Sequence, residues 1–172
     1  VANSGNYKVV SVNTSSGTVT TIAGSGEAGY EEGIGSAAQF ENIWGVALAD
    51  DDTLFVSDGD GFTDIIREID LTTNTTSSFA QDTNMASINY PSGLVSFGDY
   101  IYVCNAGIGT IEKFNNIEEH EERGASETFA GAERFGNVNG SSSDALFGRP
   151  YDMVLTADRQ YIYVADNNKI RR

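Results

Sequence analysis

Hydrophobic and polar residues alternate along most of this chain in short runs, which are interrupted by Gly, Asn and Asp. The runs favour β-branched and aromatic residues, and alternation with a period of two is typical of strands that bury one face of a sheet. No run approaches the roughly 18 consecutive apolar residues that a membrane-spanning helix requires. The pattern predicts an all-β protein with about a dozen short antiparallel strands and no helix longer than two or three turns.

One apolar and aromatic motif recurs, and each copy ends in a small residue followed by Asp or Asn. The copies are Leu54–Asp58, Ile101–Asn105 and Ile162–Asp166, and the first residues of the chain, Val1–Asn3, repeat the tail of the motif. The steps from Asn3 to Asp58, to Asn105 and to Asp166 are 55, 47 and 61 residues. A constant motif at unequal steps indicates a repeated structural unit whose loops vary in length.

Three further strands accompany each copy of the motif. One strand precedes it, and two alternating strands follow it. The preceding strands are 43–47, 90–95 and 149–154, the next are 8–12, 65–69 and 110–114, and the last are 18–24, 76–80 and 127–131. Four short antiparallel strands per repeat are typical of a β-propeller blade, which must stack on its neighbours to bury both faces. We expect the motif strand to lie deep and the outermost strand, rich in Thr and Ser, to be solvated.

The segments that join successive repeats resemble a known family. They are Ile22–Tyr30, Gly33–Phe40 and Trp44–Ala47 at one junction, and Phe129–Gly131, Asn139–Gly140, Ala145–Phe147 and Pro150 at the other. Together with the closing stretch Tyr163–Arg172, they are similar to NHL-repeat β-propellers over nearly the whole chain. The third repeat departs from the family pattern, because it lacks the Gly-rich junction and carries an insertion at 115–126. The resemblance implies stacked four-stranded blades, six to a ring in members of the family, and a general binding platform.

The repeat boundaries define a single partial propeller at 1–172. They predict the end of one blade at 1–30, a second blade at 31–84, a third at 85–140 and the start of a fourth at 141–172. An incomplete ring leaves unpaired strand edges and an exposed blade face. We therefore expect the chain to be a segment of a longer protein. Further blades of the same polypeptide, or another protein subunit, would then cover these surfaces, and we favour the first.

The charge and the cysteine content bear on which binding partners and cross-links the chain can have. The net charge of −15, from 25 acidic against 10 basic residues, opposes binding to nucleic acid and to anionic membranes. Direct membrane insertion is not expected either. The single cysteine, Cys104, allows no internal disulfide framework, and its apolar surroundings at Tyr100–Cys104 predict a buried strand residue.

Three sequons provide candidate sites for N-linked glycans, at Asn13, Asn74 and Asn139. Asn13 and Asn74 fall at the same predicted turn of successive blades, and Asn139 lies in a loop between blades. The competing interpretation is that Asn simply suits tight turns. The sequons predict an extracellular or cell-surface glycoprotein.

Neither a metal nor another cofactor is expected. Asp58, Asp60 and Asp64 share one loop and are weak calcium candidates, but Ile69 stands where a calcium loop requires a bidentate Glu. We expect this loop to be a solvated turn. The only histidine, His120, is flanked by glutamates and has no second His at zinc-binding spacing. The NHL-like amidating lyases place several His around a metal, and a single His does not supply that set.

These observations favour a non-enzymatic extracellular glycoprotein that acts as a structural scaffold or protein-interaction module. A building block of a surface or fibrous assembly is one setting for it. The alternative is a propeller enzyme of the lyase or lactonase kind, with its catalytic residues in blades absent from this chain. An intracellular RNA-binding propeller conflicts with the charge. Trp44 and Tyr151 occupy corresponding places before the motif, where we expect them to pack the inner rim of the ring.

Overall fold

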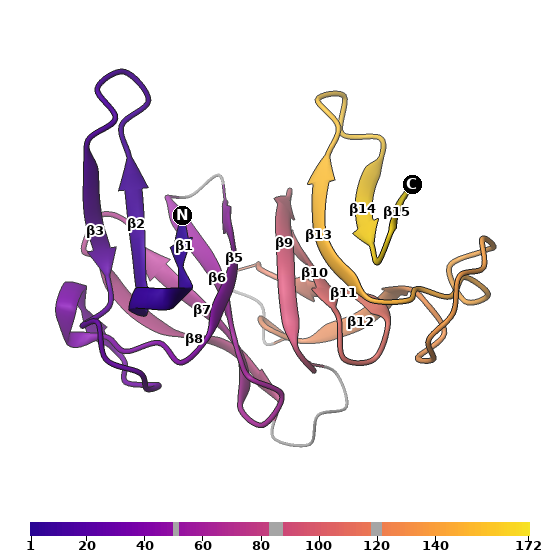
Figure 1. Cartoon of the computed structure of the whole chain (residues 1–172), viewed down its shortest axis with the longest axis horizontal. Helices are drawn as coiled ribbons and strands as arrows, with labels where there is room; N and C mark the ends of the chain where they lie inside the picture. Colours follow the sequence, from indigo (N-terminus) through magenta and orange to yellow (C-terminus); the bar gives the residue numbers. More distant parts are fainter. Residues whose placement is uncertain (50–51, 83–87, 118–121) are drawn as a thin grey trace.

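The computed structural model describes residues 1–49, 52–82, 88–117 and 122–172. These residues form fifteen strands and two 3-10 helices of three residues each, Ser4–Asn6 and Gly35–Ala37. The strands build four antiparallel sheets that follow one another along the sequence (Figure 1). The prediction of an all-β fold is confirmed. Among the described residues, no helix is long and apolar enough to cross a membrane.

The first two sheets take up the N-terminal half. Sheet 1 has the order β1 (Ala2–Asn3), β2 (Lys8–Val12) and β3 (Val19–Ala23). Sheet 2 has the order β4-β8-β7-β6-β5, built from β4 (Gly33–Ile34), β5 (Ile43–Leu48), β6 (Thr53–Asp58), β7 (Asp64–Asp70) and β8 (Thr75–Asp82). The short strand β4 was not predicted, because its two residues carry no alternation. It pairs with the outer strand β8.

The other two sheets have the same plan. Sheet 3 has the order β12-β11-β10-β9, built from β9 (Pro91–Phe97), β10 (Tyr100–Asn105), β11 (Thr110–Asn115) and β12 (Ser126–Ala130). Sheet 4 has only three strands, β13 (Pro150–Leu155), β14 (Ile162–Asp166) and β15 (Lys169–Arg171). In Figure 1 the inner strands β5, β9 and β13 lie side by side near the middle of the molecule.

Each inner strand joins its neighbour with the same irregularity. The register skips between Ile43 and Val46 in β5, and the same skip occurs in β9 and β13. This bulge makes Trp44, Ser92 and Tyr151 equivalent positions. It also brings the inner strands close together, since a Cβ on Gly93 would lie 2.5 Å from the Cα of Asp152. Glycine at this position therefore permits the stacking of β9 on β13.

Apolar side chains pack between each pair of successive sheets, in three clusters. The motif strands β6 and β10 are buried over five of their six residues, as predicted. The outer strands β3 and β12 are largely exposed, also as predicted. The outer strand β8 differs, because Thr76, Phe79 and Ala80 are buried in it. Two features cover this strand. β4 pairs with its edge. The Arg123 guanidinium lies 4.9 Å from the centre of the Phe79 ring.

Two single-residue expectations have different outcomes. Cys104 is fully buried, as predicted, and burial raises the pKa of its thiol. Trp44 and Tyr151 lie at the end of the inner strands, but neither is buried there. They are 53% and 46% exposed, because the bulge lies at the end of the inner strands, where no further layer of the described structure covers them.

The side chain of the last motif residue binds the backbone of the segment that leads into the inner strand of the same sheet. Asp58 Oδ1 accepts hydrogen bonds from the backbone N–H groups of Glu41 and Asn42, at 3.0 and 2.8 Å. Asp166 Oδ1 accepts the equivalent pair from Gly148 and Arg149, at 2.8 and 2.7 Å. Burial keeps these bonds away from competing water. The recurring acid of the sequence motif is therefore an anchor of the fold.

An arginine completes the anchor in two of the repeats, and in sheet 2 it is fully buried. Arg67 donates to the carbonyls of Gln39 and Glu31, and Arg171 donates to those of Leu146 and Val138. Each guanidinium also lies within ion-pair distance of its motif acid. Sheet 3 has Glu112 at the equivalent register position, opposite Val103. Its carboxylate accepts hydrogen bonds from Thr110 and Thr128 instead.

Candidate functional site

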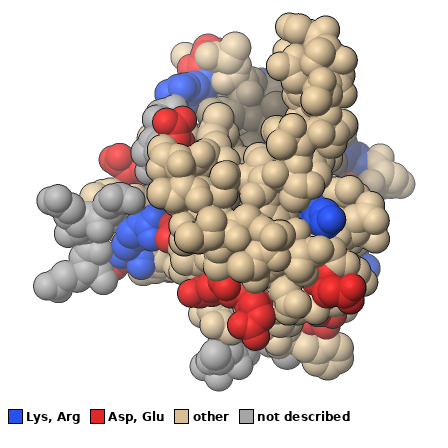
Figure 2. Space-filling view, turned by 90° about the vertical axis from the view of Figure 1, so that its left-hand side faces the viewer, with Lys and Arg blue, Asp and Glu red and all other residues tan. Residues whose placement is uncertain are grey.

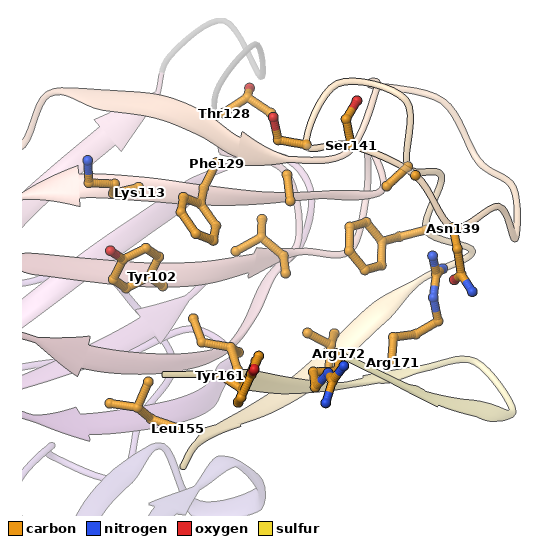
Figure 3. A pocket seen from close by; sticks show the side chains of 18 of the residues that line it. Tyr102, Lys113, Thr128, Phe129, Asn139, Ser141, Leu155, Tyr161, Arg171 and Arg172 are labelled. Carbon is orange, nitrogen blue, oxygen red and sulfur yellow. The ribbon is translucent and has the colours of Figure 1, made fainter. Parts of the chain in front are cut away.

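A groove of about 1,130 Å³ runs between sheets 3 and 4. Figure 3 shows its two walls: Tyr102, Lys113 and Phe129 from sheet 3, and Tyr161 with Arg172 from sheet 4. The loop that joins the two sheets closes one end of it. The groove therefore lies at a junction of the same kind that apolar side chains fill between sheets 2 and 3.

The sheet 3 wall is aromatic at its centre and charged at its edge. The Phe129 ring meets Tyr102 edge-on, with ring centres 4.9 Å apart. The Lys113 ammonium lies 4.0 Å from the centre of the Tyr100 ring and 2.8 Å from a carboxylate oxygen of Glu127. This ion pair raises the pKa of Lys113, chiefly through the hydrogen bond to Glu127. The wall thus presents an apolar centre that a second layer of side chains can cover.

The sheet 4 wall ends in a strand, β15, with one free edge. In sheets 1, 2 and 3, the third strand of the blade lies between two neighbours; β15 is paired only with β14. Arg171 fixes the strand from one side through the carbonyls of Leu146 and Val138 and a 3.0 Å ion pair with Asp166. The free edge of β15 offers backbone donors and acceptors for another strand.

Equivalent residues show how unusual this edge is within the molecule. Ile170 pairs with Ala165 as Ile66 pairs with Ser57 and Ile111 with Cys104. Ile66 and Ile111 are 0% and 3% exposed, whereas Ile170 is 73% exposed. Side chains of the next sheet bury this position in sheets 2 and 3, so Ile170 marks a face of sheet 4 that no described sheet covers.

The aromatic residue on the other wall shows the same contrast. Phe129 precedes Ala130 in β12, as Phe79 precedes Ala80 in β8, and each alanine pairs with the equivalent isoleucine. Phe79 is 9% exposed because Phe55 and Phe114 pack on it, with ring centres 4.8 and 6.4 Å away. Phe129 is 44% exposed. Phe129 therefore stays exposed where the equivalent Phe79 is covered.

The predicted weak calcium candidates have separate structural roles. Asp58 is buried beside Arg67, while Asp60 Oδ1 accepts the backbone N–H groups of Phe62 and Thr63. Asp64 accepts from the backbone N–H groups of Gly61 and Tyr90. Within the ranges that the structure covers, no three His, Cys, Asp or Glu side chains form a group able to hold a metal. Asp58 and Asp64 are buried, so the expectation of a wholly solvated turn is wrong for these two side chains.

The three sequon asparagines are exposed. Asn13 lies in the turn between β2 and β3, where its Oδ1 accepts from the backbone N–H groups of Ser15 and Ser16. That leaves Nδ2, the atom to which a glycan is joined, outside the turn's hydrogen bonds. Asn74 lies in the turn between β7 and β8, with a left-handed φ of 57°. Asn139 lines the groove near Arg171 (Figure 3).

Part of this site could be predicted from the sequence. It predicted unpaired edges and an exposed blade face, but not the aromatic wall formed by Tyr102 and Phe129. The signal was present in the repeated Phe-Ala pairs of β8 and β12, whose partners differ in the two sheets. His120, read as a solvated residue, lies outside the described residues.

Comparison with solved structures identifies the architecture. A protein of unknown function from Bacteroides thetaiotaomicron matches 88% of this chain and 34% of its own, with a TM-score of 0.63 and 19% identity. A chain of the nidogen/laminin complex matches 97% of this chain and 54% of its own, with a TM-score of 0.64 and 13% identity. PQQ-bound aldose sugar dehydrogenase from Streptomyces coelicolor matches 88% and 46%, with a TM-score of 0.52 and 16% identity.

These neighbours show the fold alone. The chain has a β-propeller architecture whose four described sheets do not close into a ring. It spans between 34% and 54% of the length of the three structures. No family model matches the sequence, and no curated protein matches it.

Proposed function

We propose that this chain is a non-enzymatic interaction scaffold that receives an additional β-strand on the free edge of β15. The added strand would lie in the groove, pair with β15 and cover Phe129. The free edge of β15 carries the proposal, together with the contrast between Phe129, which is 44% exposed, and its buried equivalent Phe79. Burying one large apolar side chain stabilises an assembly by about 1.5–3 kcal/mol. Strand addition to a sheet edge is a general mode of protein recognition.

The repeat also describes the strand that fits. In sheets 1, 2 and 3 the outer strand places an alanine, Ala23, Ala80 or Ala130, opposite the position equivalent to Ile170. A register shift at the residue directly before that alanine occurs each time. We therefore expect a donor with an apolar residue and then alanine. Another protein subunit or a further segment of the same polypeptide would supply it.

The setting we propose is extracellular, with NHL-type blades and N-linked glycans, in a surface or fibrous assembly. The exposed sequons at Asn13 and Asn74 support the glycans, and the net charge of −15 supports a role without nucleic acid. Figure 2 shows one face of the molecule, largely uncharged, with acidic side chains along its lower part and few basic ones. Peptide mapping of natively purified protein with and without glycosidase tests the glycans. Unmodified Asn13 and Asn74 would contradict this part of the proposal.

A peptide of residues 17–24, which contains β3, tests strand addition directly. We expect the labelled peptide to bind the chain, as measured by fluorescence polarisation. Thr20→Pro and Thr21→Pro peptides serve as controls. Successive N–H groups of a strand point to opposite sides, so one of the two loses a ladder hydrogen bond.

The groove is tested with a matched pair of variants of the chain. Phe129→Ala removes the aromatic wall and should weaken peptide binding, whereas Phe62→Ala, at a position that is 80% exposed and does not line the groove, should not. Binding that survives both proline substitutions, or that responds equally to both phenylalanine variants, would contradict strand addition.

A further inference from the structure

A second cavity, of about 260 Å³, lies away from the groove at the end of the inner strands. Its lining includes three aromatic side chains, Trp44, Tyr90 and Tyr151, together with Arg149 and Ser92. Trp44 belongs to β5 and Tyr151 to β13, at equivalent register positions, while Tyr90 directly precedes β9. Three adjacent sheets therefore contribute one aromatic residue each to a single cavity.

Tyr90, which directly precedes the inner strand of sheet 3, has an energetically unfavourable backbone conformation. Tyr90 has a left-handed φ of 50°, which is uncommon for a bulky residue. Its N–H donates to Asp64 Oδ2 at 3.2 Å, and its carbonyl accepts from the N–H of Ala106 at 3.2 Å. A side chain at Gly61 would clash with the Tyr90 ring. Strained backbone that is fixed by several contacts is characteristic of ligand sites.

The cavity floor is rigid and polar. The Ser92 hydroxyl donates to the carbonyl of Pro150 at 3.0 Å, and the Ser92 carbonyl accepts from the hydroxyl of Ser57 at 2.6 Å. These bonds join sheets 2, 3 and 4 beneath the aromatic side chains. The positions of the rings are thus set by the inner strands rather than by long loops.

Arg149 gives the cavity its charge. Its side chain is exposed, and none of the four ion pairs among the described residues involves it. Its backbone is fixed, because its N–H donates to Asp166 and its carbonyl accepts from Asn167. At physiological ionic strength, charges act over about 8 Å, so this guanidinium acts on the cavity more strongly than distant acidic side chains do.

We propose that this cavity binds a single sugar ring that carries a carboxylate. Exposed Trp and Tyr rings offer apolar faces to the C–H groups of a pyranose, and Arg binds carboxylates in a bidentate manner. The volume is below the roughly 300–1,000 Å³ of sites for drug-sized ligands, which suits one ring. The site is independent of strand addition at β15.

Trp44 is the only tryptophan of the chain, so its fluorescence reports on this cavity directly. Glucuronate and an oligogalacturonate are the probes, glucose is the neutral control, and choline tests the use of the aromatic side chains as a cation site. We expect saturable changes of Trp44 emission with both uronates. Glucose should bind with an affinity at least about tenfold lower. Equal binding of glucose, a response to choline alone, or no response at all would overturn the proposal.

Two arginine variants locate the carboxylate. Arg149→Gln should reduce uronate affinity to the level of glucose, whereas Arg134→Gln, which removes the same charge outside the cavity, should leave it unchanged. Calorimetric titration of Trp44→Phe gives a readout without tryptophan fluorescence, and we expect binding to be weakened but not lost. Full uronate affinity in Arg149→Gln would contradict the assignment.

Discussion

Arg67 shows at the scale of one residue how the repeat is held together. It is fully buried, and it joins the motif acid Asp58 to the carbonyls of Gln39 and Glu31 while its guanidinium lies 5.4 Å from the Phe40 ring centre. Burial raises the pKa of Asp58 to about 6, against the opposing effects of two backbone N–H groups and Arg67. Asp58 is therefore ionised at pH 7 and depends on these partners.

We expect Arg67→Ala to lower the free energy of unfolding by about 3–5 kcal/mol, because it leaves a buried carboxylate without its cation. Lys113→Ala is the matched control. It breaks an exposed ion pair with Glu127 and should cost about 1 kcal/mol or less. Urea denaturation at pH 7 measures both. Equal losses in the two variants would show that Arg67 is not an anchor.

Glu112 replaces that arginine in sheet 3 and predicts a pH dependence. Burial raises the pKa of its carboxyl above the ordinary 4.5, against hydrogen bonds from Thr110 and Thr128 that lower it. The folded state then holds the proton more tightly than the unfolded state does. Its contribution to stability is present below the unfolded pKa and is lost as the pH rises through the folded pKa.

Glu112→Gln should remove this dependence while keeping an acceptor for both threonines. We expect the wild-type chain to lose stability relative to Glu112→Gln as the pH is raised from about 4 to 7. Urea titrations across that range give the difference between the two proteins. A difference that stays constant with pH would show that Glu112 titrates alike in the folded and unfolded states.

At the scale of the element, the inner strands stack because two of them carry glycine at the bulge. A Cβ at Gly93 would lie 2.9 Å from the Tyr151 carbonyl and as close as 2.5 Å to Asp152. Gly93→Ala should therefore separate β9 from β13 and cost about 1–3 kcal/mol. Gly5→Ala, where a Cβ meets nothing within 4 Å, is the control for the loss of glycine. Thermal unfolding compares them, and similar melting temperatures would contradict close stacking.

The strands could be predicted because their signal is local. Alternation over a few residues and the recurring Asp or Asn located the motif strands β6, β10 and β14, and the burial of Cys104 followed from its apolar neighbours. The pairing of β4 with β8 was missed, because two residues show no period. The polar anchors were missed for a different reason: Arg67 binds carbonyls 28 and 36 residues away, and no local pattern records such distances.

The aromatic cavity at the end of the inner strands was harder to predict than the fold. Trp44 and Tyr151 were recognised as equivalent, but their exposure depends on the bulge that turns them toward the end of the inner strands. Tyr90 gave no signal, since its left-handed backbone follows from contacts with Asp64 and Ala106. Asp64 itself was read as part of a solvated turn, whereas it is buried and holds Tyr90.

At the scale of the whole molecule, one face of sheet 4 stays open. Tyr163 and Ile170 lie on it and are exposed. Phe55 and Tyr102, which are equivalent to Tyr163 in sheets 2 and 3, are buried against the next sheet. Leaving each large apolar side chain in water costs about 1.5–3 kcal/mol, against a typical domain stability of about 5–15 kcal/mol. The open face and the free edge of β15 together define the surface through which we propose that the scaffold assembles.

Sedimentation velocity of residues 1–172 across a range of concentrations tests this account most directly. We expect the chain to associate as its concentration rises, and Ile170→Lys to weaken that association by placing a charge on the open face. Thermal unfolding of the variant checks that its fold is retained. A soluble, cooperatively unfolding monomer at every concentration, with or without the substitution, would contradict a surface that requires a partner.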